Sequence, residues 1–403
     1  IKAIDAEVLH QLNRGLIEIS MEDIFSPPVA TRVFAYPNLA FYEVINHKKN
    51  ISVINRLFPS SIKLSSDKNI SYEQAATIAY LRVAKKLVFT EGMVDSLEQS
   101  LIEKYEFNKA SIGYGESMAN QINLWIDQDN YARVKADDFY SIKTSDSTWV
   151  LTPPAFDSAL EPNWNKLRPI YLKNLKDFEA SPKPKFDSNK NSEFYKYALE
   201  VYNHSKQKDS ASYRIAKHWD CNPNEYNNTG HNTYFIHRIS PPGHWVNITK
   251  LICKNNNANL TQTSLAYCAV TSAIFDGIIS CWNTKYSMQL LRPVTFINKY
   301  IDKNWLPFIQ TPPFPEYTSG HSVVSGASSK VLSSIFKNTS FVDDTEVEFG
   351  MPKRSFSSAT EAGQEASLSR FYGGIHYRFG VENGFKQGEK IGNFIIDHLL
   401  KSK

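Results

Sequence analysis

Apolar side chains recur every three or four residues through most of this 403-residue chain, and this spacing restricts the fold more than any other feature. It is clear in DAEVLHQLNRGLIEIS (residues 5–20) and in PPVATRVFAYPNLAFYEVI (residues 27–45). Strictly alternating patterns, which are typical of strands, are scarce. We therefore expect an all-α protein made of helical bundles, as two four-helix bundles, with long irregular loops.

Local signals support several helix starts. Pro27 and Pro28 suit a first helical turn. SYEQAATIAYLRVAKKLVF (residues 71–89) begins with a candidate N-cap, Ser71, and Gln74 three residues later completes a capping-box pattern. Residues 93–106 and 109–126 are further candidate helices.

The composition changes between residues 128 and 190. TPPAFDSALEPNWNKLRP and SPKPKFDSNKNS are rich in Pro, Asn, Ser and Lys, which favours a long covering loop. We expect one helical domain over residues 1–403, with an N-terminal helical half (1–127), the covering loop (128–190) and a second half from about 190 to 403.

Composition argues against some kinds of partner. The net charge of +4 gives no strong footprint for nucleic acid or a membrane surface. No window approaches 18 uninterrupted apolar residues, so no membrane-spanning segment is expected. The chain begins at Ile1 with no visible signal peptide, which suggests a mature form that is secreted or periplasmic. Its oligomeric state does not follow from the sequence.

The cysteines leave two interpretations open. Their number is even and no CxxC spacing occurs, so they are either buried thiols or disulfide partners. Cys221 and Cys253 form the favoured pair, because both flank loop-like sequence. The other two are Cys268 and Cys281.

One strongly apolar segment leads into two cationic residues. AYCAVTSAIFDGIISCWNTKY (residues 266–286) has a buried helical stripe that includes Trp282. Lys285 and Arg292 are seven residues apart, so a continuing helix would place both on one face. Pro293 opposes this, because it biases Arg292 away from helical geometry. The two cations are either solvated surface charges or ligands of one anion.

A second segment, FPEYTSGHSVV (residues 314–324), suggests an anion site at a helix start. Thr318 or Ser319 can cap a helix that begins near His321, and its first N–H groups would favour an anion. Gly320 permits close approach of the backbone. The alternative is a plain N-cap with a buried, hydrogen-bonded histidine.

A third segment, SLSRFYGGIHYRFG, contains Arg370 and His376, which are six residues apart. Combined with the first two segments, it gives three positive charges, neutral donors and two histidines. This set suits a tetrahedral oxyanion. One histidine can act as acid or base and the other can bond to the central atom. A zinc site is not indicated, since no paired Cys/His or HExxH spacing occurs. His231, His237 and His244 are six and seven residues apart in a loop-like stretch.

These segments resemble a known superfamily. KYSMQLLRP, SGHS and SRFYGGIH look like the three signature segments shared by vanadium-dependent haloperoxidases and type-2 phosphatidic acid phosphatases. Their order and spacing match across about 90 residues. Upstream segments also resemble the soluble bacterial haloperoxidases, and among them the iodoperoxidases of marine bacteria.

The resemblance implies a vanadate cofactor, with vanadium(V), and a role for each motif residue. His376 matches the histidine that binds vanadium, and His321 matches the acid–base histidine. Lys285 also has a catalytic role, as hydrogen-bond donor to the reacting peroxide. Trp282 and Phe314 match aromatic residues on the halide side of the pocket, although core packing is the alternative for both. The positions that match vanadate-binding residues are Lys285, Arg292, Ser319, Gly320, Arg370 and His376.

The chain departs from the family pattern at two positions. Thr318 stands where the family often has Pro, which would loosen the loop or reshape the pocket rim. Gly380 stands where the family often has an Asp, four residues after the histidine. Another acceptor must then orient His376. Asp220 and Asp276 are candidates for this role.

The implied activity is oxidation of a halide by hydrogen peroxide to hypohalous acid. Iodide is the expected halide, because it is the most easily oxidised, and bromide is a second candidate. Two alternatives remain. A soluble acid phosphatase would use the same residues through a phosphohistidine intermediate, and an oxyanion-binding protein would need neither histidine. The absence of predicted membrane helices and the long N-terminal part favour the peroxidase.

Overall fold

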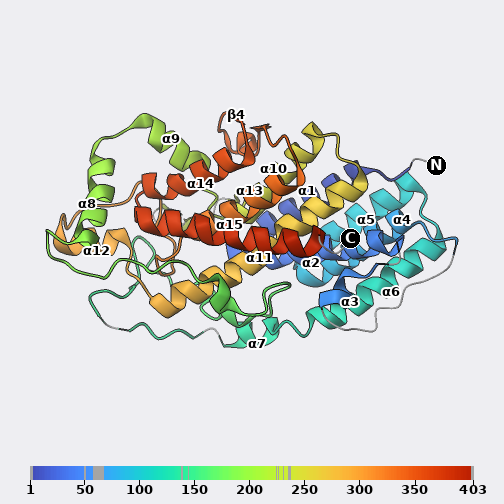
Figure 1. Cartoon of the computed structure of the whole chain (residues 1–403), viewed down its shortest axis with the longest axis horizontal. Helices are drawn as coiled ribbons and strands as arrows, with labels where there is room; N and C mark the ends of the chain where they lie inside the picture. The colour runs from blue at the N-terminus through green and yellow to red at the C-terminus, as the bar shows by residue number, and fades with distance from the viewer. Residues whose placement is uncertain are drawn as a thin grey trace.

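The computed structural model describes residues 3–400 except Asn50, 58–67, Asp138, Thr144, Asn224, Tyr226, Gly230 and 235–236. Helices dominate this part of the chain (Figure 1). They are α1 Ala6–Glu22, α2 Pro27–His47, α3 Val53–Leu57, α4 Tyr72–Leu87, α5 Glu91–Tyr105, α6 Lys109–Ile126, α7 Tyr131–Ala136, α8 Glu193–Lys206, α9 Ser210–His218, α10 Pro241–Asn255, α11 Leu260–Met288, α12 Pro293–Tyr300, α13 Gly320–Ile335, α14 Ala359–Tyr372 and α15 Arg378–Leu400.

The remaining regular structure is small. Three 3₁₀ turns occur at Trp164–Lys166, Leu175–Phe178 and Val347–Phe349 (η1–η3). The described strands form two antiparallel pairs, β1 Asn227–Thr229 with β2 Asn232–Tyr234 and β3 Phe341–Asp343 with β4 Arg354–Phe356. The all-α prediction is confirmed.

Two groups of helices share one long member, α11. On one side α11 contacts α2, which packs with α4 and α6. On the other side it contacts α13 and α15, which pack with each other and with α14. Figure 1 shows the N-terminal helices in blue and cyan at one end, with α13, α14 and α15 extending toward the other. The division into halves and covering loop stays a prediction.

The position of α11 explains its composition. By length and apolar content it is the one described helix that could cross a membrane, yet 94% of its most apolar window is buried inside the protein. A helix surrounded by other helices needs apolar residues on all sides. Its apolar character is therefore that of a core helix.

Most helix starts follow from their caps. Ser26 accepts a hydrogen bond from Val29 N, and Pro27 and Pro28 fill the first turn of α2, as predicted. Ser71 caps α4 by accepting from Gln74 N (3.3 Å). The Gln74 side chain instead accepts from Asn108 N, so the predicted capping box is only half formed.

Small residues let α13 and α15 approach closely. A Cβ at Gly326 would collide with the Phe385 carbonyl, and one at Gly388 would lie 2.8 Å from Ala327 N. Small residues therefore allow α13 to pack tightly against α15. This packing fixes the start of α13, where the SGH segment lies, against the last helix.

The covering segment is held by one buried carboxylate. Asp276, on α11, accepts hydrogen bonds from the backbone N–H groups of Ile170, Tyr171 and Leu172 (2.7, 2.7 and 3.1 Å). Its side chain is fully buried. A stretch with little regular structure is thereby fixed across the central helix, and α7 lies at its beginning.

The structure decides between the two interpretations of the cysteines and corrects the placement of one histidine. All four cysteines are free and buried, so the interpretation as buried thiols is confirmed and no Cys221–Cys253 bridge forms. The Cys221 sulfur lies against His244 (3.2 Å) instead. His244 was expected in a loop but lies in the first turn of α10, because Ser240 caps that helix and Pro241 and Pro242 begin it.

Candidate active site

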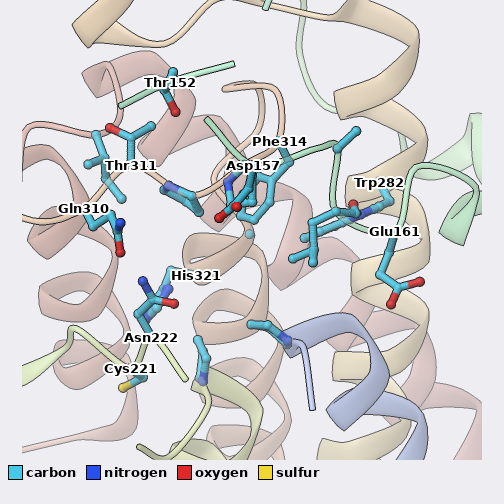
Figure 2. A pocket seen from close by; sticks show the side chains of 18 of the residues that line it. Thr152, Asp157, Glu161, Cys221, Asn222, Trp282, Gln310, Thr311, Phe314 and His321 are labelled. Carbon is cyan, nitrogen blue, oxygen red and sulfur yellow. The ribbon is translucent and has the colours of Figure 1, made fainter. Parts of the chain in front are cut away.

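A pocket of about 410 Å³ lies where the three sequence motifs meet. It is lined by Gly320 and His321 from the start of α13, by Arg370 from the end of α14 and by His376 from the loop before α15. Trp282 and Phe314 line it as well (Figure 2). The covering segment contributes residues such as Thr152 and Asp157, so residues far apart in sequence enclose one space.

Lys285 lies behind the wall of this pocket and is fully buried. Its Nζ donates to the carbonyls of Pro315 and Glu316 (2.8 and 3.0 Å). Burial, together with the positive charge of Arg292, lowers the pKa of Lys285 to about 7. A bound anion would favour the charged form.

Arg292 does not share a helix face with Lys285. Helix α11 ends at Met288, Gln289 takes a left-handed conformation, and Arg292 is the extended residue before α12. The two cations nevertheless lie near each other, since both are within 5 Å of the Phe314 ring centre (4.8 and 4.9 Å). Pro293 thus keeps Arg292 out of helical geometry, as expected for a residue that precedes proline.

The Arg292 guanidinium is only partly satisfied. Nε donates to Phe314 O (2.8 Å) and Nη1 to Ile375 O (2.9 Å), with His376 Nε2 at 3.0 Å. Nη2 is buried and has no hydrogen-bond partner. Such a donor in a buried site needs an acceptor, which a bound oxyanion would supply.

Ser319 caps α13, as the sequence indicated. Its hydroxyl oxygen accepts from Ser322 N (3.3 Å), and its own proton is free to donate. Gly320 begins the helix beside Trp282. The N-terminus of α13 therefore presents backbone N–H groups close to the pocket, and its dipole favours an anion there.

His321 faces the pocket, and its Nε2 is buried without a hydrogen-bond partner. The alternative of a buried histidine with all its hydrogen bonds made therefore does not hold. Burial lowers the pKa of His321 well below its ordinary value, and the nearby charge of Arg370 adds to this. The ring is neutral at pH 7 and can accept a proton.

Arg370 is held from the other side. Its Nη1 donates to Trp219 O (2.8 Å), and its Nη2 lies 3.6 Å from Asp220 Oδ1. Asp220 therefore supports Arg370 and does not bond to His376, so its predicted role is wrong. Asp276 is also wrong for that role, because its carboxylate binds the covering segment.

The acid that orients His376 is Glu316. His376 Nδ1 lies 2.8 Å from Glu316 Oε1, which also accepts from Tyr377 N (3.1 Å). A carboxylate on Nδ1 places the proton there and leaves the Nε2 lone pair for a ligand. Burial raises the pKa of Glu316 to about 7, against the opposing charges of Lys285 and Arg292.

Gly380 and Glu316 depend on each other. A Cβ at Gly380 would collide with Glu316 Oε1. The glutamate carboxylate thus fills the space into which a side chain at position 380 would extend. The available signal was an acidic residue, Glu316, within FPEYTSGH in a chain that lacks the usual acid at position 380.

Thr318 does not reshape the pocket rim. It is fully buried, does not line the pocket, and donates to Gln387 Oε1 on α15 (2.7 Å). The expected loosening is absent because this bond and the Cys281 contact (3.5 Å) hold the residue.

Trp282 and Phe314 line the pocket and also pack as core residues, whereas their role toward a halide stays a prediction. Their rings contact each other (5.0 Å between centres) and line the pocket, yet they are only 1% and 9% exposed. The Trp282 N–H donates to Leu160 O (3.2 Å), which fixes the indole against the covering segment. They form an apolar pocket wall beside the cations.

The residues fit vanadate. Three cations neutralise a multiply charged oxyanion, and Arg292 Nη2 is a buried donor without an acceptor. The Nε2 lone pair of His376, now beside Arg292 Nη1, is directed by Glu316. Vanadate would be held by Lys285, Arg292, Ser319, Gly320, Arg370 and His376.

Comparison with known proteins gives the same family. Residues 265–402 match a family model described as the second helical-bundle domain of VCPO. A comparison with curated proteins gave no significant match.

Solved structures extend the likeness over nearly the whole chain. The chain is 41% identical to a bacterial vanadium-dependent iodoperoxidase, covering 98% of this chain and 97% of that one, with a TM-score of 0.91. Holo and apo bacterial vanadium-dependent chloroperoxidases share the fold at 16% and 15% identity, with TM-scores of 0.71 and 0.72. They cover 94% of this chain and 94% and 95% of their own. The chain belongs to the vanadium-dependent haloperoxidases.

Proposed function

We propose that this haloperoxidase oxidises iodide with hydrogen peroxide, using vanadate held by the motif residues. The observation that carries the site assignment is the convergence of the three motifs on one pocket. Arg370, His321 and His376 line this pocket, and Lys285 and Arg292 lie against the ring of Phe314, which forms part of its wall. Buried polar atoms of Arg292 and His321 have no hydrogen-bond partners. The relative at 41% identity is an iodoperoxidase, which supports iodide as the halide. Bromide is the second candidate.

The residues divide the work by chemistry. When bound, vanadate supplies a Lewis acid that activates hydrogen peroxide toward halide. His321 is neutral and takes up the proton that the incoming peroxide releases. Lys285, Arg292 and Arg370 would compensate the negative charge of the bound anion. The Lys285 ammonium donates to two backbone carbonyls and would keep one N–H for the anion. Trp282 and Phe314 form an apolar surface for a large, weakly hydrated anion.

Iodide oxidation in the presence of vanadate tests this function. Vanadate-free protein is titrated with orthovanadate, and triiodide formation is followed with iodide and hydrogen peroxide. Activity should rise with vanadate and fall when phosphate competes. Among iodide, bromide and chloride, it should be highest with iodide. A vanadate-saturated sample that oxidises no halide, but hydrolyses a phosphate monoester without vanadate, would support the phosphatase instead.

Replacement of the proposed vanadium ligand gives a sharper test. His376→Ala should lose more than about 100-fold in activity, beyond the 10–100-fold typical when only a supporting partner of a ligand is lost. His237 is exposed and does not line this pocket, so His237→Ala should retain wild-type activity. Full activity in His376→Ala would refute the assignment.

A further inference from the structure

A second group of buried polar side chains lies beside the pocket. Cys221 follows α9, His244 is in the first turn of α10, and Glu346 precedes η3. All three are at most 2% exposed. Cys221 also lines the pocket, and Figure 2 labels its sulfur in the region of Asn222 and His321. None of the three is among the residues proposed to hold vanadate.

The three potential ligand atoms have the spacing of a tetrahedral metal site. Cys221 Sγ lies 3.2 Å from His244 Nδ1, and Glu346 Oε1 lies 3.7 Å from both. Ligands of a tetrahedral zinc ion, with bonds of about 2.0–2.3 Å, are separated by about 3.4–3.6 Å. An ion could therefore enter with shifts of a few tenths of an ångström.

The far side of His244 has the support that a metal-binding histidine normally has. Its Nε2 lies 2.7 Å from Asp343 Oδ2. Asp343 is held in turn by Thr345, whose N and Oγ1 both donate to Oδ1 (3.0 and 2.6 Å). With a metal ion bound between the three side chains, a carboxylate on Nε2 would keep the proton there and leave the Nδ1 lone pair for the ion.

A neighbouring group that also includes His244, together with His218 and Asp343, is less suitable as a metal site. His218 Nε2 and His244 Nε2 both lie against Asp343 Oδ2, at 3.1 and 2.7 Å. A nitrogen and an oxygen bound to one zinc ion would be about 3.4 Å apart, so these are hydrogen bonds. Asp343 is therefore a support for His244 and not a ligand.

We propose that Cys221, His244 and Glu346 bind a zinc ion. The thiolate and the carboxylate balance the double positive charge, and a thiolate with an imidazole favours zinc over magnesium or calcium. Three protein ligands leave one position for water or a small anion.

This zinc site would stabilise the segment that holds Arg370. Trp219 and Asp220, which contact Arg370 through a carbonyl and a carboxylate, immediately precede Cys221. The Trp219 ring also stacks on His244 (4.6 Å between centres). A zinc ion tying Cys221 to α10 and to the η3 segment would restrict the movement of these two residues.

Metal content tests the proposal independently of haloperoxidase activity. Protein purified without added metal is analysed for zinc by mass spectrometry, before and after removal with a chelator and reloading. We expect one equivalent per chain, regardless of vanadate. Asp343→Asn should weaken zinc binding by about 10–100-fold, as loss of a ligand's supporting partner typically does. Cys221→Ser and Glu346→Gln should lose more.

The matched control is Cys253→Ser. Cys253 is equally buried and on the same helix as His244, but belongs to neither metal-ligand group in the described residues. Its substitution should leave the zinc content unchanged. If a variant fails to fold, cobalt loading of wild-type protein decides, since a Cys221 ligand gives a thiolate-to-metal charge-transfer band. A zinc content no higher than background, together with the absence of this band, would show that the three side chains only hydrogen-bond to one another. That result would overturn the site.

Discussion

His376 depends on an acid that lies 60 residues earlier in the chain. Glu316 belongs to the loop before α13, whereas the usual acid of this family would follow the histidine. In this chain the absence of a side chain at Gly380 makes room for Glu316.

Glu316→Gln keeps the shape of this contact but removes its charge. The amide cannot hold the His376 proton as firmly, so the lone pair at Nε2 becomes a weaker donor. We expect vanadate affinity to fall by about 10–100-fold, measured by titrating activity with vanadate. A glutamine variant with unchanged affinity would show that Glu316 only fills space.

An exchange of the two positions separates charge from packing. Gly380→Asp alone should lose activity, because its side chain collides with Glu316. Glu316→Gly combined with Gly380→Asp should recover part of the activity that either single change removes. Activity of the double variant equal to the product of the two single effects would exclude this coupling.

The sequence predicted the motif residues but not their support. Lys285, Ser319 and Arg370 could be assigned to the site because each motif is local and its chemistry is distinctive. Glu316 was missed because the two partners of a long-range hydrogen bond have no fixed spacing. The partner of Arg370, Asp220, was noticed as an acid but assigned to the wrong residue for the same reason.

Helix α13 illustrates what small residues do for an element. Gly326 on α13 and Gly388 on α15 occupy positions where a Cβ would meet backbone atoms of the facing helix. The two helices can therefore lie closer than side chains would allow. This contact fixes the N-terminus of α13, on which Ser319 and His321 depend.

Gly388→Ala should destabilise the protein by about 1–3 kcal/mol, as overpacking of a core typically does. The added methyl group would lie 2.8 Å from Ala327 N. Gly113→Ala, in α6, is the control, since nothing lies within 4 Å of its Cβ position. It should stabilise by about 0.5–1 kcal/mol, because alanine favours a helix. Chemical denaturation measures both, and equal effects would contradict close packing.

Helices were predictable as elements because their signals are local. The interpretation of residues 109–126 as a helix matches the bounds of α6, which Asn108 caps. The geometry from Lys285 to Arg292 was left open, since a helix and a break were both compatible with the spacing. In the structure the helix ends at Met288, Gln289 is left-handed, and its carbonyl accepts from Trp149 N in the distant covering segment.

Across the whole molecule, the first helix is linked to the central one through His10. Its Nδ1 lies 2.9 Å from the Tyr267 hydroxyl on α11. Burial lowers the pKa of His10 to about 4. The unfolded chain takes up this proton near pH 6.5, earlier than the folded protein does.

The contribution of His10 to the free energy of unfolding should therefore be fully present above about pH 6.5 and be lost as the pH falls toward 4. His10→Gln removes this contribution, so its unfolding free energy should depend less on pH, by on the order of 2–3 kcal/mol over that range. Denaturant titrations at several pH values measure the difference. The exposed His237→Gln should follow the wild-type curve, and a similar curve for His10→Gln would contradict the assignment.

The enclosure of the pocket was beyond sequence reasoning. Composition predicted a covering segment, but the attachment of residues 170–172 to Asp276 depends on three backbone N–H groups that no side-chain pattern reveals. Its part in the pocket wall follows only from the assembled chain.

The shared helix α11 also limits how this enzyme can be divided. Residues 265–402 match the family model and carry every proposed vanadate ligand. A fragment of this length would keep α13 and α15 but lose α2, leaving one apolar side of α11 exposed to water. The catalytic part is therefore recognisable as a sequence unit but is not a module that could be grafted onto another protein.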